Sequence, residues 1–214
     1  MQPFSVTFVS SCLGISDLRF PVLIGDAMEK EENDLEGNPW TRLARRMVYE
    51  NPWIRLEEDQ VIRPDGERGI YGVVRFKNRA VGVVPLDEND RILLVGQYRY
   101  TLDEYSWEIP EGGVPLDEDP LAGAQRELLE ETGYTAGKWR ELGRAHLSNS
   151  VSDELAIYFL AQDLHPGTPR PEGTERLAVR WVTLQEALGM VERGALTDAL
   201  SIIAIQRVTL VRDT

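Results

Sequence analysis

The chain has 214 residues, of which 42% are hydrophobic and 28% charged, so it carries enough apolar material for one buried core of ordinary size. Its net charge of −13 argues against an electrostatic nucleic-acid binder and against a protein that docks on membranes through a basic surface. The single cysteine, Cys12, excludes an intrachain disulfide and a cysteine-based zinc site. No apolar run is long enough to span a membrane, and the apolar N-terminal stretch lacks a basic start, so we expect a cytoplasmic protein.

The acidic charge is concentrated in two windows. Residues 26–37 hold six acidic residues and one lysine, a charge of −5, and residues 103–131 hold ten acidic residues and one arginine, a charge of −9. The first window is polar and has no periodicity, so we expect residues 1–38 to be a poorly ordered extension and linker. We expect residues 39–214 to form the folded domain, in which the second window needs an explanation of its own.

The first part of the expected domain has the composition of strands joined by short turns. The expected strands are 47–50, 53–62, 69–76, 80–85 and 91–100. Their quick succession predicts an antiparallel β-region over 39–76, followed by a catalytic core over 77–214 that begins with further strands.

A helix is expected over 120–131, inside the second acidic window. Asp119 is a good N-cap, Pro120 suits the first helical position, and Gly133 follows where a left-handed C-cap residue belongs. Strands are expected at 139–146, 155–161 and 177–182, followed by a helix that a capping box opens at Thr183 and a last helix capped by Thr197. This order of elements predicts an α/β (α+β) layered domain.

Three carboxylates project from one side of the helix expected at 120–131. Glu127 and Glu131 are four residues apart and Glu130 lies between them, while Arg126 can pair with Glu130. Such a face is either fully solvated or holds a divalent cation, and oxygen ligands of this kind suit Mg²⁺ or Mn²⁺. The spacing around the helix decides between these alternatives.

The segment runs Gly112, five residues, Glu118, seven residues, and then Arg-Glu-Leu-Leu-Glu-Glu-Thr-Gly-Tyr from Arg126 to Tyr134. This pattern resembles the Nudix box, the signature of the Nudix hydrolase superfamily. Its one soft departure is Tyr134, where an aliphatic residue is more usual. The resemblance implies a Nudix fold, with a mixed β-sheet sandwiched between helices, and hydrolysis of a nucleoside diphosphate linked to another group.

The resemblance also assigns roles to residues of the box. It implies that Glu127, Glu131 and Glu130 bind the metal, that Glu130 also takes part in catalysis, and that the carbonyl of Glu111 is a further ligand. Arg126 is expected to assist catalysis by holding these glutamates in place. A metal held there would clamp phosphate oxygens and lower the pKa of the attacking water.

Residues before the box resemble one branch of the superfamily. Gln97-Tyr98-Arg99, followed by Glu-Ile-Pro at 108–110, is similar to the ADP-ribose pyrophosphatase and nucleotide-sugar hydrolase branch. Gln97, Tyr98 and Arg99 are therefore expected to bind substrate, with Arg99 as a bidentate phosphate donor. The β-region at about 47–76 is similar to one that relatives exchange between the subunits of a homodimer, so a homodimer is expected.

The catalytic base in this branch usually follows the box in a loop, and Glu154 in the segment 148–154 is the candidate. ADP-ribose-selective relatives tend to carry a proline in this part of the chain, yet none occurs between Gly133 and Pro166. That argues against ADP-ribose as the sole substrate and favours other nucleoside diphosphate sugars, such as GDP-mannose. The expected substrate is therefore ADP-ribose, GDP-mannose or a similar nucleoside diphosphate sugar. The alternatives are other nucleotides, such as triphosphates, dinucleotides or capped RNA, and a non-catalytic nucleotide sensor.

Overall fold

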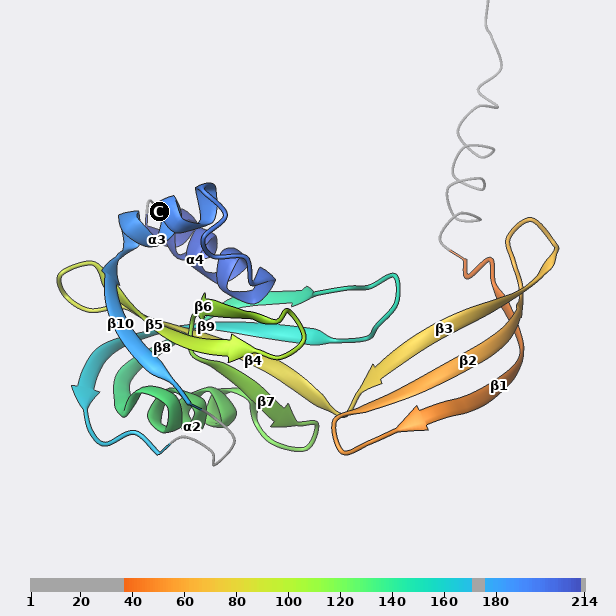
Figure 1. Ribbon diagram of the computed structural model, residues 1–214, viewed down its shortest axis with the longest axis horizontal. Helices are drawn as coiled ribbons and strands as arrows, with labels where there is room; N and C mark the ends of the chain where they lie inside the picture. The colour runs from red at the N-terminus through yellow and green to blue at the C-terminus, as the bar shows by residue number, and fades with distance from the viewer. Residues whose placement is uncertain (1–36, 171–175, 213–214) are drawn as a thin grey trace, which may run out of the picture. The chain divides into compact units, whose positions relative to one another are not determined.

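The computed structural model describes residues 37–170 and 176–212 (Figure 1). Chain contacts divide the protein into two units, residues 1–41 and 42–214, and the site described below lies in the second. The extension predicted over 1–38 lies outside the described residues except for its last two positions. Among the described helices, none combines the length and apolar character that crossing a membrane requires.

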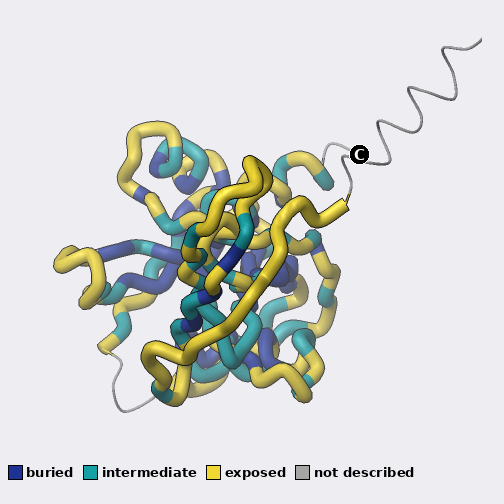
Figure 2. The backbone as a smooth tube through the Cα atoms, turned by 90° about the vertical axis from the view of Figure 1, so that its right-hand side faces the viewer, coloured by how far each residue is buried: buried dark blue, intermediate teal, exposed yellow. Residues whose placement is uncertain are grey.

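The N-terminal region is a three-stranded sheet in the order β1-β2-β3, with strands β1 (Thr41–Glu50), β2 (Ile54–Ile62) and β3 (Arg68–Phe76). The expected antiparallel pairing is confirmed for β2 and β3, which run from Ile54 opposite Phe76 to Ile62 opposite Arg68. β1 begins six residues earlier than expected, at Thr41. All ten of its residues are exposed, as the yellow colour in Figure 2 shows. The strand therefore has no buried face that would produce alternating apolar residues in its sequence.

A four-stranded mixed sheet forms the centre of the catalytic core. Its order is β7-β4-β9-β8, with strands β4 (Asn78–Pro85), β7 (Glu111–Pro115), β8 (Tyr134–His146) and β9 (Leu155–Pro166). β4 and β9 are parallel, whereas β7 and β8 pair antiparallel with their neighbours. The sheet therefore has the mixed character that the sequence predicted.

A second core sheet has the antiparallel order β10-β5-β6, with strands β5 (Arg91–Arg99), β6 (Glu104–Glu108) and β10 (Ala178–Thr183). The short strands β6 and β7 were not expected. Their sequences, Glu-Tyr-Ser-Trp-Glu and Glu-Gly-Gly-Val-Pro, have no run of strand-forming residues, and glycine and proline weaken β7. Pairing with β5 and β4 fixes them instead, which a local pattern does not reveal.

The described part of the chain has helices α2 (Pro120–Thr132), α3 (Leu184–Glu192) and α4 (Ala199–Arg212). Both predicted caps of α2 are confirmed: Asp119 accepts from the N–H of Leu121, and Gly133 is left-handed with φ 77°. The predicted cap of α4 was wrong. Asp198, one residue after Thr197, accepts from the backbone N–H of Ser201 at 2.6 Å, which places its carboxylate at the start of α4.

The mixed sheet lies between α2 on one face and α4 on the other (Figure 1). Successive residues of β9 point to opposite faces. Ile157, Phe159 and Ala161 pack with the α2 side, and Ala156, Tyr158 and Leu160 pack with the α4 side. Gly82 of β4 lets α4 approach closely, because a Cβ there would lie 1.9 Å from Cδ2 of Leu200. The predicted sandwich of a mixed sheet between helices is therefore confirmed.

Candidate active site

The box folds as strand β7, a loop and helix α2, and the start of β7 lies directly against two carboxylates of α2. The backbone N–H of Glu111 donates to Oε2 of Glu131 at 3.0 Å, and the side chain of Glu131 is buried within the helix face that meets β7. Gly112 lies directly against Glu127, since a Cβ at Gly112 would be 2.2 Å from Cδ of that carboxylate. Glycine is thus required at Gly112 to leave room for the Glu127 carboxylate.

Arg126 gathers the carboxylates on the exposed side of the box. Its Nη1 donates to Glu127 at 2.7 Å and to Glu130 at 3.1 Å, and its Nη2 donates to the carbonyl of Gly113 at 3.2 Å. Glu118 lies 3.7 Å from the same guanidinium. Arg126 therefore ties the helix to β7 and to the box loop, and its supporting role in catalysis stays a prediction.

A second arginine, Arg99 of β5, holds the carboxylates that precede the box. It pairs with Glu108 at 2.5 Å and with Glu111 at 2.6 Å, and the Glu108 side chain is only 3% exposed. Gln97 lies beside them, with its amide nitrogen 3.4 Å from Glu108. Gln97 and Arg99 thus belong to a polar network around the buried carboxylate of Glu108, next to the box.

Burial is the largest influence on Glu111, and with the nearby carboxylates of Asp198 and Glu108 it raises the pKa of Glu111 well above its usual range, although Arg99 opposes the shift. Its Oε2 is buried and has no hydrogen-bond partner. Such an atom is costly unless a donor or a cation is placed against it. The Glu111 carboxylate is therefore costly to keep ionised in these surroundings.

Next to this network is a pocket of about 630 Å³, within the size range of small-ligand sites. Of the residues predicted for the site, Arg99, Glu111 and Glu154 line it together. Gln97 and Tyr98 are not among the described residues that line it, and the Tyr98 side chain is 57% exposed with its hydroxyl hydrogen-bonded to Asp103. The role of Tyr98 at the substrate stays a prediction.

Asp198 is a pocket residue that the sequence analysis missed. It enters from the start of α4 and lines the pocket with Glu111 and Glu154. Burial, and then the charge of Asp198, raise the pKa of Glu154 above its usual range. The sequence offered a signal, since Asp198 precedes an apolar helix as a good N-cap, but Thr197 beside it gave the same signal.

The pocket also has lining residues from the N-terminal part of the domain and from β4. Trp53, in the turn between β1 and β2, and Phe76, at the end of β3, contribute aromatic side chains. Arg79 of β4 contributes a second arginine, whose guanidinium donates to the carbonyl of Leu116 in the box loop at 2.7 Å. None of the three stood out in the sequence, because their placement depends on chain folding rather than on local spacing.

The donor set fits a hard divalent cation, although it is not a preformed cage. Among the described residues, no three acidic, histidine or cysteine side chains are close enough to form a ready-made metal site. The carboxylates of Glu127 and Glu130 are instead paired with Arg126, and one oxygen of Glu111 is paired with Arg99. Carboxylate oxygens are nevertheless what Mg²⁺ and Mn²⁺ prefer, and the unpartnered Oε2 of Glu111 is an acceptor that a cation would satisfy.

Comparison with known families matches two consecutive parts of the chain. The NUDIX domain matches residues 76–202, and the nucleoside diphosphate sugar hydrolase N-terminal domain matches residues 40–74. The first match spans the mixed sheet, the box and most of the pocket. The second spans the three-stranded sheet.

Individual relatives agree with these matches. An ADP-ribose pyrophosphatase of Bacillus subtilis is 33% identical over 170 residues, covering 78% of this chain and 91% of that protein. A GDP-mannose pyrophosphatase of Yersinia pestis is 31% identical over 153 residues, covering 69% of this chain and 74% of that protein. A solved structure described as an ADP compounds hydrolase matches with a TM-score of 0.72 at 23% identity, covering 79% of this chain and 92% of that one, and this likeness shows the fold alone.

Proposed function

Because the chain belongs to the Nudix hydrolase superfamily, and is thus an enzyme acting on phosphoanhydride bonds, we propose that its substrate is a nucleoside diphosphate sugar. Hydrolysis of the bond between the two phosphates would release a nucleoside monophosphate and a sugar phosphate. The match of residues 40–74 and the activities named for the relatives support this substrate class. The observation that carries the proposal is that Glu111, which directly precedes the box, and Glu154 line one pocket.

The carboxylates of Glu127, Glu130 and Glu131, with Glu111, are proposed to hold Mg²⁺ or Mn²⁺. When bound, such a cation neutralises phosphate charge, lowers the pKa of a bound water and stabilises the leaving group. Arg126 keeps Glu127 and Glu130 in place through the contacts at 2.7 and 3.1 Å. Arg126 and Glu130 therefore contribute to catalysis by shaping the site.

Glu154 is proposed to accept the proton of the attacking water. Its pKa is raised by burial and by the neighbouring charge of Asp198, which brings it closer to the pH at which the enzyme works. A base is most effective when its pKa lies near the operating pH. The raised pKa thus makes Glu154 a stronger base than an exposed glutamate.

Two arginines and two aromatic side chains give the pocket the chemistry to bind a nucleotide. Arg99 and Arg79 are proposed to bind phosphate oxygens, for which the guanidinium fork is suited. Trp53 and Phe76 offer aromatic faces against which a base can stack. Gln97 is proposed to act through Glu108, at 3.4 Å, rather than by touching the substrate.

A homodimer is proposed on the exposure of β1. Its ten residues are all exposed, and they include the large side chains of Leu43, Met47 and Tyr49, at 50%, 58% and 55% exposure. Apolar side chains on an exposed strand are typical of an interaction surface. Light scattering coupled to size exclusion tests this, and a monomer at micromolar concentration would contradict it.

The test of the substrate proposal is a panel of ADP-ribose, ADP-glucose, UDP-glucose and GDP-mannose, each incubated with the protein and Mg²⁺. Nucleoside monophosphate should appear with at least one member and should vanish when a chelator is added. Activity confined to nucleoside triphosphates, dinucleotides or capped RNA would favour the alternative substrates. Tight nucleotide binding without any turnover would indicate a sensor instead.

A further inference from the structure

The segment that carries Glu154 is fastened to the N-terminal sheet. The backbone N–H of Val74 in β3 donates to the carbonyl of Val151 at 2.9 Å, and the N–H of Asp153 donates back to the carbonyl of Val74 at 3.3 Å. The hydroxyl of Tyr71, also in β3, donates to the carbonyl of Ser150 at 2.7 Å. The segment 148–154 therefore follows the edge of β3 through main-chain contacts.

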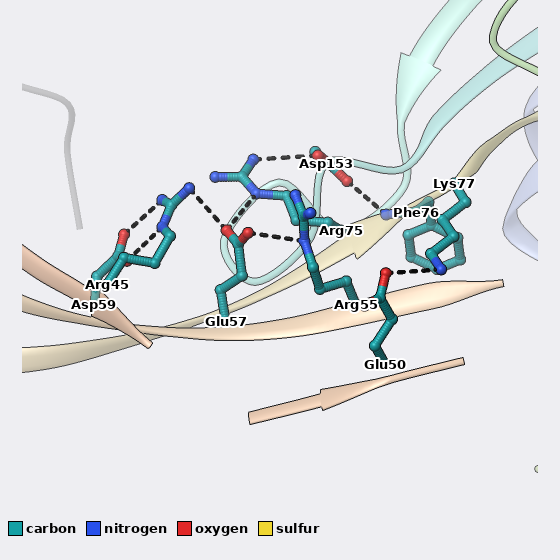
Figure 3. A network of polar contacts seen from close by, with 9 residues as sticks. All are labelled: Arg45, Glu50, Arg55, Glu57, Asp59, Arg75, Phe76, Lys77 and Asp153. Carbon is teal, nitrogen blue, oxygen red and sulfur yellow. Dashed lines mark hydrogen bonds and ion pairs between the residues drawn. The ribbon is translucent and has the colours of Figure 1, made fainter. Parts of the chain in front are cut away.

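The side chain of Asp153 adds a polar anchor at the same edge (Figure 3). Its Oδ1 accepts from the backbone N–H of Phe76 at 2.9 Å, and its Oδ2 accepts from Nη1 of Arg75 at 3.1 Å. Both carboxylate oxygens are thus used by consecutive residues of one strand. Two bonds to one carboxylate fix its direction as well as its distance.

Arg75 is itself held by a carboxylate that three arginines share. Glu57 of β2, with a side chain only 5% exposed, lies 2.8 Å from Arg45, 2.9 Å from Arg55 and 3.2 Å from Arg75. Figure 3 shows Arg75 between Glu57 and Asp153. We call Glu57, Arg75 and Asp153 the Asp153 clamp. Because Glu57 is buried and multiply paired, the clamp joins the segment 148–154 to an ordered part of the sheet.

Asp153 and Glu154 are neighbours in the chain, but their side chains lie in different parts of the protein. The Asp153 carboxylate bonds to β3, whereas Glu154 lines the pocket with Glu111 and Asp198. The carbonyl of Glu154 also accepts from the N–H of Leu147 at 3.4 Å. The position of the Glu154 main chain is therefore defined between the end of β8 and the clamp.

We propose that Arg75 and Asp153 are positioning residues, through which the N-terminal sheet holds Glu154 at the reaction centre. This rests on the role proposed for Glu154 above. A displacement of a reacting group by about 1 Å can cost about a hundredfold in rate. Loss of the clamp should therefore lower kcat while leaving most of the substrate-binding surface, and hence KM, unchanged.

The test combines clamp variants with a change at Glu154. Arg75→Ala and Asp153→Ala should each lower kcat about tenfold to a hundredfold, with KM changed less than about threefold. In a Glu154→Gln background, Arg75→Ala should add less than about twofold, because a clamp that acts only through Glu154 has nothing left to position. The matched control is Arg63→Ala, which breaks an exposed pair with Asp65 at 2.9 Å in the turn between β2 and β3 and should leave kcat unchanged.

Two further measurements keep the result interpretable. Asp153→Asn keeps an acceptor for the Phe76 N–H and replaces Asp153→Ala if that variant does not fold. Its kcat should lie between those of the parent chain and Arg75→Ala. Amide hydrogen exchange over 148–154 should become faster in the clamp variants and stay unchanged in Arg63→Ala. Slow exchange in every variant would overturn the clamp as a structural tether.

The kinetic outcomes separate this proposal from the proposed function. Suppose that Glu154→Gln lowers kcat. If Arg75→Ala then leaves kcat unchanged, or lowers it by the same factor with Glu154 as with Gln at position 154, the clamp proposal is overturned and the role of Glu154 survives. If Glu154→Gln is as active as the parent, the role of Glu154 fails and the clamp proposal fails with it. A parent chain that hydrolyses no nucleotide sugar overturns the proposed function, and faster exchange would then leave the clamp as a contact without a catalytic purpose.

Discussion

Replacing Arg99 with methionine should destabilise the fold in a pH-dependent way. Arg99 is the group that pairs Glu108 and Glu111, whose side chains are 3% and 14% exposed, at 2.5 and 2.6 Å. Methionine keeps most of the apolar stem and removes the charge. Removing one partner of a buried ion pair lowers the free energy of unfolding by about 3–5 kcal/mol. Since Arg99 itself is 35% exposed, we expect the lower end of this range, about 3 kcal/mol.

The sign of the pH dependence follows from Glu111. Burial and nearby carboxylates already raise its pKa, and Arg99 is the charge that opposes them, so the pKa rises further in the variant. A carboxyl with a raised folded-state pKa favours the fold below its unfolded pKa and loses that contribution as the pH rises through the folded value. The loss of unfolding free energy caused by Arg99→Met should therefore be larger at about pH 8 than at about pH 5.

Urea unfolding followed by tryptophan fluorescence measures this free energy at both pH values. Arg144→Met is the control, because it breaks an exposed pair with Glu141 at 2.8 Å and should leave the free energy of unfolding nearly unchanged at either pH. A loss below about 1 kcal/mol for Arg99→Met at the higher pH would show that Arg99 does not stabilise the two buried carboxylates. A loss of equal size at both pH values would contradict the predicted pH dependence.

Three further predictions concern the site itself. Glu131→Gln should lower kcat by about a hundredfold or more in Mg²⁺ assays with an unchanged circular dichroism spectrum, and near-normal turnover would remove the metal-binding role proposed for it. Gly112→Ala should weaken metal binding about tenfold to a hundredfold by calorimetry with little loss of stability, because the new Cβ would fall 2.2 Å from the flexible end of Glu127; unchanged metal affinity would contradict this. Asp198→Asn should move the acid limb of the kcat profile to lower pH, because the Asp198 charge raises the pKa of Glu154, and an acid limb that stays in place would show that another group controls it.

The parts of the structure that local rules govern could be predicted from the sequence. The spacing of the box located α2, and Asp119 and Gly133 marked its ends as the structure has them. Apolar runs located β4, β5 and β9, because buried strands between helices need apolar residues on both faces. These signals lie within single elements and do not depend on what packs against them.

The remaining features depend on contacts between distant parts of the chain. β7 is a strand only because Glu111 to Pro115 pairs with β4. Asp198 reaches the pocket only because α4 packs against the mixed sheet at Gly82. The contact between Arg75 and Asp153 joins residues 78 positions apart. One sequence without an alignment holds no local signal for such a pair, so the pocket wall and the clamp emerged only from the fold.

The most direct test of the account follows a nucleoside diphosphate sugar by ³¹P NMR in the presence of the parent chain and Mg²⁺. The paired diphosphate signals should decay and two phosphomonoester signals should grow in equal amounts, one from the nucleoside monophosphate and one from the sugar phosphate. Diphosphate signals that persist for every nucleotide sugar in the panel, or that give inorganic phosphate as the first product, would contradict it.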